Sequence, residues 1–111
     1  MISKKELPLC PVATTVWLID SKWKLLLLRD LLNGVQRYND FQKSLPEISQ
    51  KVLTQSLKSM VEDGIVIRTA YPEVPPRVEY SLSELGNSLR PIINAMADWG
   101  KEYQNLNVND K

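Results

Sequence analysis

The polar side chains of residues 49–63 are spaced for chemistry on one face of a helix. Apolar residues recur at helical intervals and form the stripe expected to be buried: Leu53, Leu57, Met60 and Val61. The outer face then carries Gln50, Lys51, Thr54, Gln55 and Lys58. Glutamine can bond to adenine with both polar atoms, threonine can contact a thymine methyl group, and lysine can meet a phosphate or a guanine edge. This face is therefore suited to the major groove of DNA.

Ser49 stands where this helix is expected to begin and can act as its N-cap. A helix N-terminus also offers backbone N–H groups and the positive end of the helix dipole to a phosphate. On an isolated helix the same face would be ordinary solvated surface. A short helix is expected before it and a β-hairpin after it, and that context favours DNA contact.

The composition excludes most familiar catalytic and metal sites. The chain has one cysteine and no histidine, so it can build neither an internal disulfide, nor a Cys/His zinc site, nor a Ser-His or Cys-His catalytic pair. Its four glycines are too scattered for a phosphate-binding loop. We therefore expect no enzyme, no metal and no cofactor. A small enzyme would require a pocket with paired carboxylates.

The net charge is only +1, so any DNA contact depends on where the charges lie. Between residues 36 and 77 there are six basic and five acidic side chains. We expect base contacts from Gln50, Thr54 and Gln55. The side chains expected at phosphates are Arg37, Lys43, Lys51, Lys58 and Arg77. A strand arginine such as Arg68 or Arg77 can equally pair with Glu79.

The helices that must position this face are marked by their ends. Pro11 suits the first position of a helix, and Ser21 can cap a second one that is apolar nearly all round and stops at Asn33-Gly34. Asn39, with Gln42 three residues on, predicts the N-cap of a brief helix that Pro46 closes. These elements would form the body against which residues 49–63 pack.

Two alternating segments, 65–71 and 77–82, predict a β-hairpin with a stiff tip at residues 72–76. Ser83 opens the last helical region, in which Pro91 should produce a kink or a split into two helices. Apolar residues follow there in steps of four and three: Leu85, Leu89, Ile92, Met96, Trp99 and Tyr103. This is the rhythm of a helix-helix seam, and we expect it to pair with a second copy of the chain. The alternative is packing within the monomer against residues 12–19.

Several short pieces of the chain together resemble one known family over about residues 10–100. They are Cys10-Pro11-Val12, Lys22-Trp23-Lys24, Arg37-Tyr38, the run ISQKVLT at 48–54, Asp63-Gly64 and the run PPRVEYSL at 75–82. The family is the HxlR-type bacterial transcriptional regulators. The resemblance implies a dimeric winged helix, MarR-like in outline, in which residues 49–63 read the major groove and 72–76 form the wing. Family members often have glycines where this chain has Asp20-Ser21, which affects the expected tightness of that turn.

Cys10 is the candidate redox residue. A thiol at a helix N-terminus lies at the positive end of the dipole, which favours the thiolate form. The alternative is a small buried hydrophobic residue, as most free cysteines are. The resemblance implies a position at which some family members respond to oxidants or electrophiles. A single cysteine can form a disulfide only with another chain or a small thiol.

The sequence thus predicts an α+β, mostly helical fold: a winged helix-turn-helix with a C-terminal dimerisation helix. We expect a flexible arm at residues 1–9, one domain at 10–104 that includes the dimerisation helices, and a frayed tail at 105–111. The expected partners are double-stranded DNA, as a pseudo-palindromic operator, and a second copy of the chain. No segment approaches the length of a membrane span, so we expect a cytoplasmic protein. The main rival is a winged helix used only for protein contacts, which would need an apolar patch on the outer face of residues 49–63.

Overall fold

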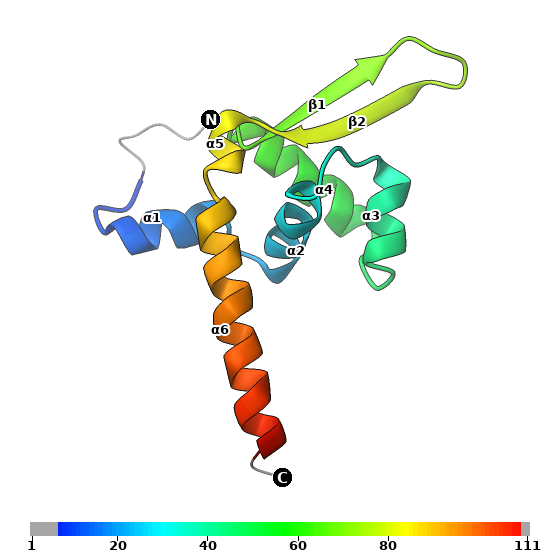
Figure 1. The fold of residues 1–111 in the computed structure, drawn as a ribbon. Coiled ribbons are helices and arrows are strands. Elements are labelled where there is room, and N and C mark those ends of the chain that lie inside the picture. Colours follow the sequence, from blue (N-terminus) through cyan, green and yellow to red (C-terminus); the bar gives the residue numbers. More distant parts are fainter. Residues whose placement is uncertain (1–6, 110–111) are drawn as a thin grey trace.

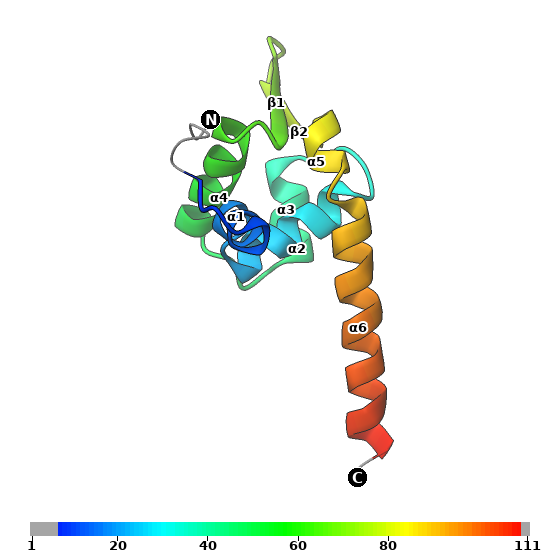
Figure 2. The ribbon, with the colours of Figure 1, turned by 90° about the vertical axis from the view of Figure 1, so that its left-hand side faces the viewer.

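The computed structural model describes residues 7–109 and contains a helical body, a hairpin and a long C-terminal helix (Figure 1). The elements in chain order are α1 Pro11–Leu18, α2 Lys22–Leu31, α3 Tyr38–Ser44, α4 Gln50–Glu62, β1 Val66–Tyr71, β2 Arg77–Leu82, α5 Glu84–Asn87 and α6 Arg90–Asn109. In Figures 1 and 2 the hairpin projects from one end of the body and α6 runs away from the other. The predicted winged helix-turn-helix is confirmed.

Three serine caps lie where the sequence predicts helix starts. The Oγ atom of Ser21 accepts the N–H of Lys24 at 3.1 Å, and Ser49 Oγ accepts the N–H of Val52 at 3.1 Å. Ser83 caps α5 in the same way. Each cap pairs an N–H group that the first turn of a helix would otherwise leave without a partner.

The predicted start of α3 is wrong. Its N-cap is Arg37 rather than Asn39, and the carboxylate of Asp40 accepts the backbone N–H of Arg37 at 2.8 Å. Gln36, the residue before, is held extended by a bridge in which it and Tyr80 each donate a backbone N–H to the other's carbonyl. The chain therefore turns into the helix directly after the bridge, and Asp40 serves as the acidic residue of the first turn.

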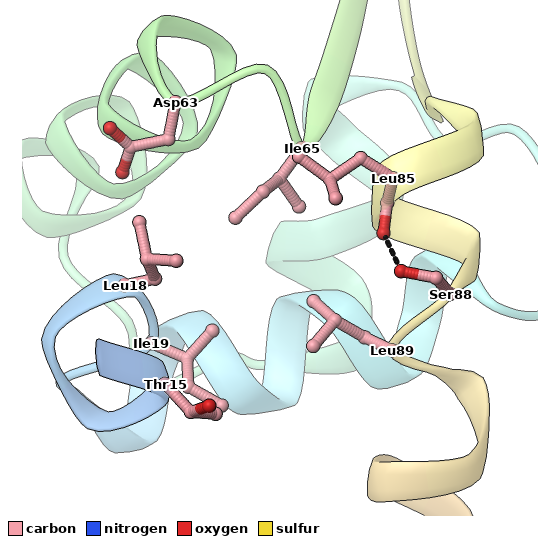
Figure 3. Close-up of a pocket in the computed structure, with 8 residues that line it drawn as sticks. All are labelled: Thr15, Leu18, Ile19, Asp63, Ile65, Leu85, Ser88 and Leu89. Carbon is pink, nitrogen blue, oxygen red and sulfur yellow. Dashed lines mark hydrogen bonds between the residues drawn. The ribbon is translucent and has the colours of Figure 1, made fainter. Parts of the chain in front are cut away.

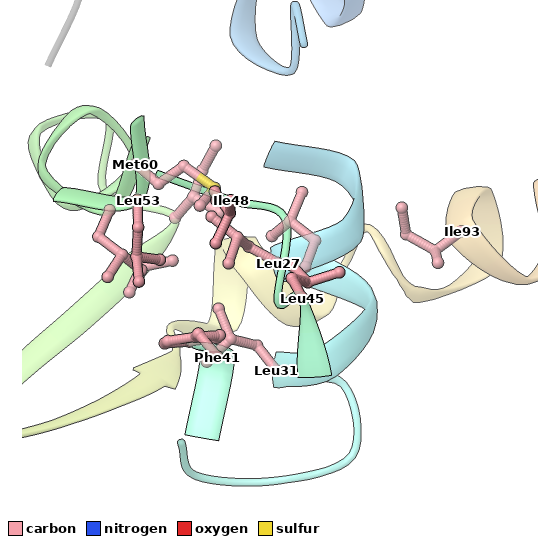
Figure 4. Packing of buried hydrophobic residues seen from close by; sticks show 12 residues of the cluster. Leu27, Leu31, Phe41, Leu45, Ile48, Leu53, Met60 and Ile93 are labelled. Carbon is pink, nitrogen blue, oxygen red and sulfur yellow. The ribbon is translucent and has the colours of Figure 1, made fainter. Parts of the chain in front are cut away.

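The core lies among α2, α3, α4 and the base of the hairpin (Figure 4). Leu53, Leu57 and Met60 of α4 are fully buried as predicted, and Val61 is partly buried. The other core residues are Leu27, Leu28, Leu31, Phe41, Leu45, Ile48, Ile65, Val66 and Ile93. This packing fixes which side of α4 turns outward.

The two strands pair antiparallel from Val66 opposite Leu82 to Tyr71 opposite Arg77. The proline-rich tip lies beyond them. At the base of the hairpin, the ring of Tyr80 meets that of Phe41 edge to face at a centroid distance of 6.0 Å. The hairpin is thus anchored to α3 as well as to α4.

The last helical region is split into α5 and α6, which is one of the two outcomes predicted; the break lies at residues 88–89, and Pro91 stands in the first turn of α6. Of α6, Ile93 reaches the core. The helix continues through Asn109. The frayed tail expected at residues 105–111 stays a prediction. Residues 110–111 and most of the predicted arm, 1–6, lie outside the described residues. No helix within residues 7–109 is both long and apolar enough to cross a membrane.

Candidate DNA-binding surface

The outward face of α4 is polar and open. Its side chains Gln50, Lys51, Thr54, Gln55 and Lys58 are all exposed. Neither lysine takes part in an ion pair within residues 7–109. The rival protein-contact module required an apolar patch here, and the exposed side chains of this face are polar instead.

Tyr38, at the start of α3, holds the first two turns of α4. Its hydroxyl lies 3.2 Å from the carbonyl oxygen of Gln50, to which it can donate, and 3.0 Å from Oγ1 of Thr54. Sequence reasoning missed this role, because Tyr38 carries no local signal of a partner twelve or sixteen residues away. The contact orients Thr54 before any DNA arrives.

Lys24 fixes the opposite flank of α4. Its ammonium group donates to Ser59 Oγ at 3.0 Å and pairs with Asp20 at 3.2 Å, and its side chain is only 12% exposed. The charge of Lys24 is therefore balanced by Asp20 within the protein. Asp20, in the turn before α2, is the carboxylate partner of this lysine.

A groove of about 420 Å³ separates α4 from the hairpin. Its walls are Thr54, Lys58, Val61 and Glu62 on the helix and Arg68 and Tyr80 on the strands. Arg68 is exposed and forms no ion pair within the described residues. Two cations, Lys58 and Arg68, thus line the groove, with Glu62 the acidic residue beside them.

Arg77 has carboxylate partners within the wing. Its guanidinium pairs with Glu73 at 3.0 Å and with Glu79 at 3.7 Å, and it lies over the ring of Tyr71 at 4.0 Å. The pairing with Glu79, left open by the sequence, is present. Arg37, the N-cap of α3, and Lys43 on α3 are exposed and form no ion pair within residues 7–109.

A second surface is apolar and runs over α1, α5 and α6. The seam residues Leu85, Ile92, Met96, Trp99 and Tyr103 are each at least 40% exposed, and Trp99 reaches 67%. Leu89 is partly buried against the core. Trp99 and Tyr103 stack on each other at 5.5 Å. Val12, Val16 and Trp17 of α1 are exposed as well. Packing within the monomer therefore leaves most of this surface uncovered.

A small pocket of about 100 Å³ lies between α1, the turn after α4, and α5 (Figure 3). Its lining is mainly aliphatic, from Leu18, Ile19, Ile65, Leu85 and Leu89. Asp63 is its one carboxylate, so the pocket lacks the carboxylate pair that glycoside hydrolysis uses.

Cys10 is exposed and forms the N-cap of α1 through its backbone. Its carbonyl oxygen accepts the N–H of Thr14 at 3.0 Å. The alternative that Cys10 is a small buried hydrophobic residue is wrong in the monomer, because α1 begins at the edge of the body rather than inside it.

The arrangement of body, outward polar helix and hairpin matches known proteins. A family model described as HxlR-like helix-turn-helix matches residues 18–108. The chain belongs to the HxlR-like helix-turn-helix family. It is 47% identical over 95 residues to the uncharacterised HTH-type transcriptional regulator YdeP of Bacillus subtilis strain 168, covering 86% of this chain and 74% of YdeP.

Solved structures agree with this family. The redox regulator HypR in its reduced form is 40% identical, with a TM-score of 0.85 over 90% of this chain and 99% of HypR. A structure from Porphyromonas gingivalis W83, assigned to the MarR family, is 39% identical, with a TM-score of 0.81 over 92% of this chain and 97% of its own. This HxlR-like protein is accordingly a DNA-binding transcriptional regulator and not an enzyme.

Proposed function

We propose that this HxlR-like regulator binds a pseudo-palindromic operator as a homodimer. The two copies of α4 enter successive major grooves about 34 Å apart. The observation that carries the proposal is the pairing of two surfaces on one small chain: an open polar face on α4 and an open apolar face on α1, α5 and α6. The first suits DNA and the second suits a second copy.

Base recognition falls to Gln50, Thr54 and Gln55. All three are exposed on the first two turns of α4. The two glutamines can each read an adenine edge, and Thr54, oriented by Tyr38, presents its methyl group to a thymine. Each good base contact of this kind discriminates by about 1–3 kcal/mol.

We assign phosphate contact to basic side chains that have no carboxylate partner within residues 7–109. On α4, on α3 and at its N-cap these are Arg37, Lys43, Lys51 and Lys58, and Ser49 adds the helix N-terminus. In the groove beside the hairpin, Arg68 joins Lys58. Arg77 contributes less than the sequence suggested, because Glu73 and Glu79 already balance its charge. This division gives a nearly neutral chain a locally basic DNA side.

The dimer forms through the apolar seam. A groove of about 470 Å³ between α1, the start of α2 and α6 is lined by Val16, Ile92 and Met96 among others, so a partner helix has a place to lie. Exposed apolar side chains gathered on one face of a monomer mark a protein interface. Closed two-fold symmetry then presents both α4 helices on one side.

Sedimentation equilibrium of Trp99→Glu tests this dimer, with Lys101→Glu as the matched control. Lys101 is exposed and lies half a turn away from the seam on α6, so the control places a glutamate on the other face and changes the net charge by more than Trp99→Glu does. The parent and Lys101→Glu should have about twice the chain mass of 12.7 kDa, whereas Trp99→Glu should be monomeric and bind operator at least tenfold more weakly. A dimeric Trp99→Glu with unchanged operator affinity would contradict the proposal.

A redox response through Cys10 is the second proposal. The exposed thiol at the N-cap of α1 supports it, together with the likeness to the redox regulator HypR. Cys10 lies at the start of the helix that carries Val12 and Val16, next to the proposed interface. An oxidant could therefore join two chains, or add a small thiol, at a place where the dimer geometry would change.

A further inference from the structure

The two ends of the hairpin meet at a single carbonyl group. Ile65, in the connection from α4 to β1, presents its carbonyl oxygen to Ser83, in the connection from β2 to α5. The N–H of Ser83 donates to that oxygen at 3.1 Å, and the Ser83 hydroxyl lies 3.0 Å from it and 2.6 Å from the carbonyl of Gly64. The same hydroxyl oxygen accepts the N–H of Gly86 at 3.0 Å. Gly64, Ile65, Ser83 and Gly86 are called here the hairpin joint.

Gly86 is buried and closes the joint by having no side chain. A Cβ atom added there would lie 2.1 Å from the carbonyl oxygen of Ile65 and 3.0 Å from Cδ2 of Leu82. Backbone cannot yield as a flexible side chain does. Glycine is therefore required at position 86 for the close approach of α5 to the end of α4. The backbone conformation does not require it, because the φ of Gly86 is not positive.

The joint is where the DNA-reading and dimer-forming parts of the chain connect. Gly64 and Ile65 follow α4 directly, whereas Ser83 and Gly86 lead through α5 into α6 (Figures 1 and 2). Beyond it, Arg90 at the start of α6 donates to Asn87 Oδ1 at 2.9 Å and to the carbonyl of Leu32 at 3.3 Å. The direction of α6 relative to α4 is thus held at two points.

We propose that Ser83 and Gly86 are positioning residues that set the half-site spacing this regulator accepts. In a dimer joined through α6, the distance between the two reading helices depends on the angle between α4 and α6 in each copy. The joint fixes that angle without touching DNA. This inference rests on the proposed homodimer.

The geometry gives the size of the effect. Lengthening the 2.1 Å contact to 3.0 Å, the shortest distance that real Cβ atoms show, moves α5 by about 1 Å, and over a helix about 6 Å long this is a tilt of about 10°. At the far end of α6, about 30 Å away, such a tilt becomes about 5 Å. One base pair advances about 3.4 Å along DNA, so a change of about one or two base pairs in preferred spacing is expected.

A spacer series tests the positioning role. Operators keep the two half-sites selected by the parent, and the spacer between them is shortened or lengthened by one, two or three base pairs. Gly86→Ala should shift the preferred spacing by at least one base pair. Ser83→Ala, which adds no volume, should broaden the preference. Lys101→Ala is the control, because Lys101 is exposed on the face of α6 that points away from the seam.

Two further readouts separate positioning from folding. A single half-site duplex measures α4 alone, and its affinity should stay within about threefold of the parent; urea unfolding reports stability. If Gly86→Ala does not fold, Ser83→Ala carries the test. Equal loss of affinity at every spacing, or an unchanged spacing profile in both variants, would overturn the inference. A parent that binds all spacings alike would overturn the dimeric operator itself, and the inference with it.

Discussion

Replacing Lys51 by alanine should weaken the salt dependence of operator binding. Lys51 is exposed on the first turn of α4 and has no carboxylate partner within residues 7–109. Its ammonium group is free to neutralise a phosphate, which releases a condensed counterion from DNA. The variant should therefore show a shallower slope of log affinity against log salt concentration. It should do so on every DNA sequence.

The magnitude follows from the two copies in a dimer. Each neutralised phosphate contributes about 0.9 to the slope, so removing Lys51 from both protomers should reduce it by about 1.8. Between 50 and 200 mM salt, log concentration changes by about 0.6. Over that range the fold-decrease in operator affinity should then be about ten times smaller for the variant than for the parent.

Fluorescence anisotropy on an operator and on an unrelated duplex of equal length measures the slope. Lys101→Ala is the control, because it removes one exposed lysine from α6 and changes the net charge equally. The control should keep the parent slope. Equal slopes for parent and Lys51→Ala, or an equal fall in both variants, would refute the assignment of Lys51 to a phosphate.

Three other predictions follow from the same surfaces. Gln55→Ala should relax base preference at one position in each half-site, worth about 1–3 kcal/mol of discrimination, and sequencing of selected DNA that returns the parent profile would count against it. An oxidant should change the operator affinity. It should also add a disulfide-linked species on a non-reducing gel or a thiol adduct in the mass spectrum. Cys10→Ser should lose both responses, and a variant that still responds would rule Cys10 out as the redox residue. Leu53→Ala should lower the free energy of unfolding by about 2–5 kcal/mol, since Leu53 is fully buried. Urea titrations at fixed protein concentration measure this. A loss below about 1 kcal/mol would mean that α4 is held mainly by its polar contacts.

Local signals carried the outline of the fold from the sequence alone. Pro11, Ser21 and Ser49 each act within one helical turn, so their roles depend on neighbours only a few residues away. The stripe of α4 and the alternation of the hairpin likewise repeat over short distances. That is why the order of elements and the outward face of α4 were predictable.

Features that depend on distant partners were not predictable in the same way. Arg37 is an unusual N-cap residue, and its bridge-forming neighbour Gln36 meets Tyr80 only in the folded chain. The contact of Tyr38 with α4 and the partly buried hydrogen bond of Lys24 to Ser59 join residues far apart in sequence. The need for glycine at position 86 arises from a carbonyl group twenty-one residues earlier. Each requires the tertiary arrangement that local patterns do not specify.

Selection of bound sequences from random double-stranded DNA tests whether this protein reads DNA as a dimer. Two α4 helices in successive major grooves should enrich one motif with two inverted half-sites about 10–10.5 base pairs apart, centre to centre. Recovery of no motif, or of a single half-site without its inverted mate, would contradict a dimeric reader of DNA.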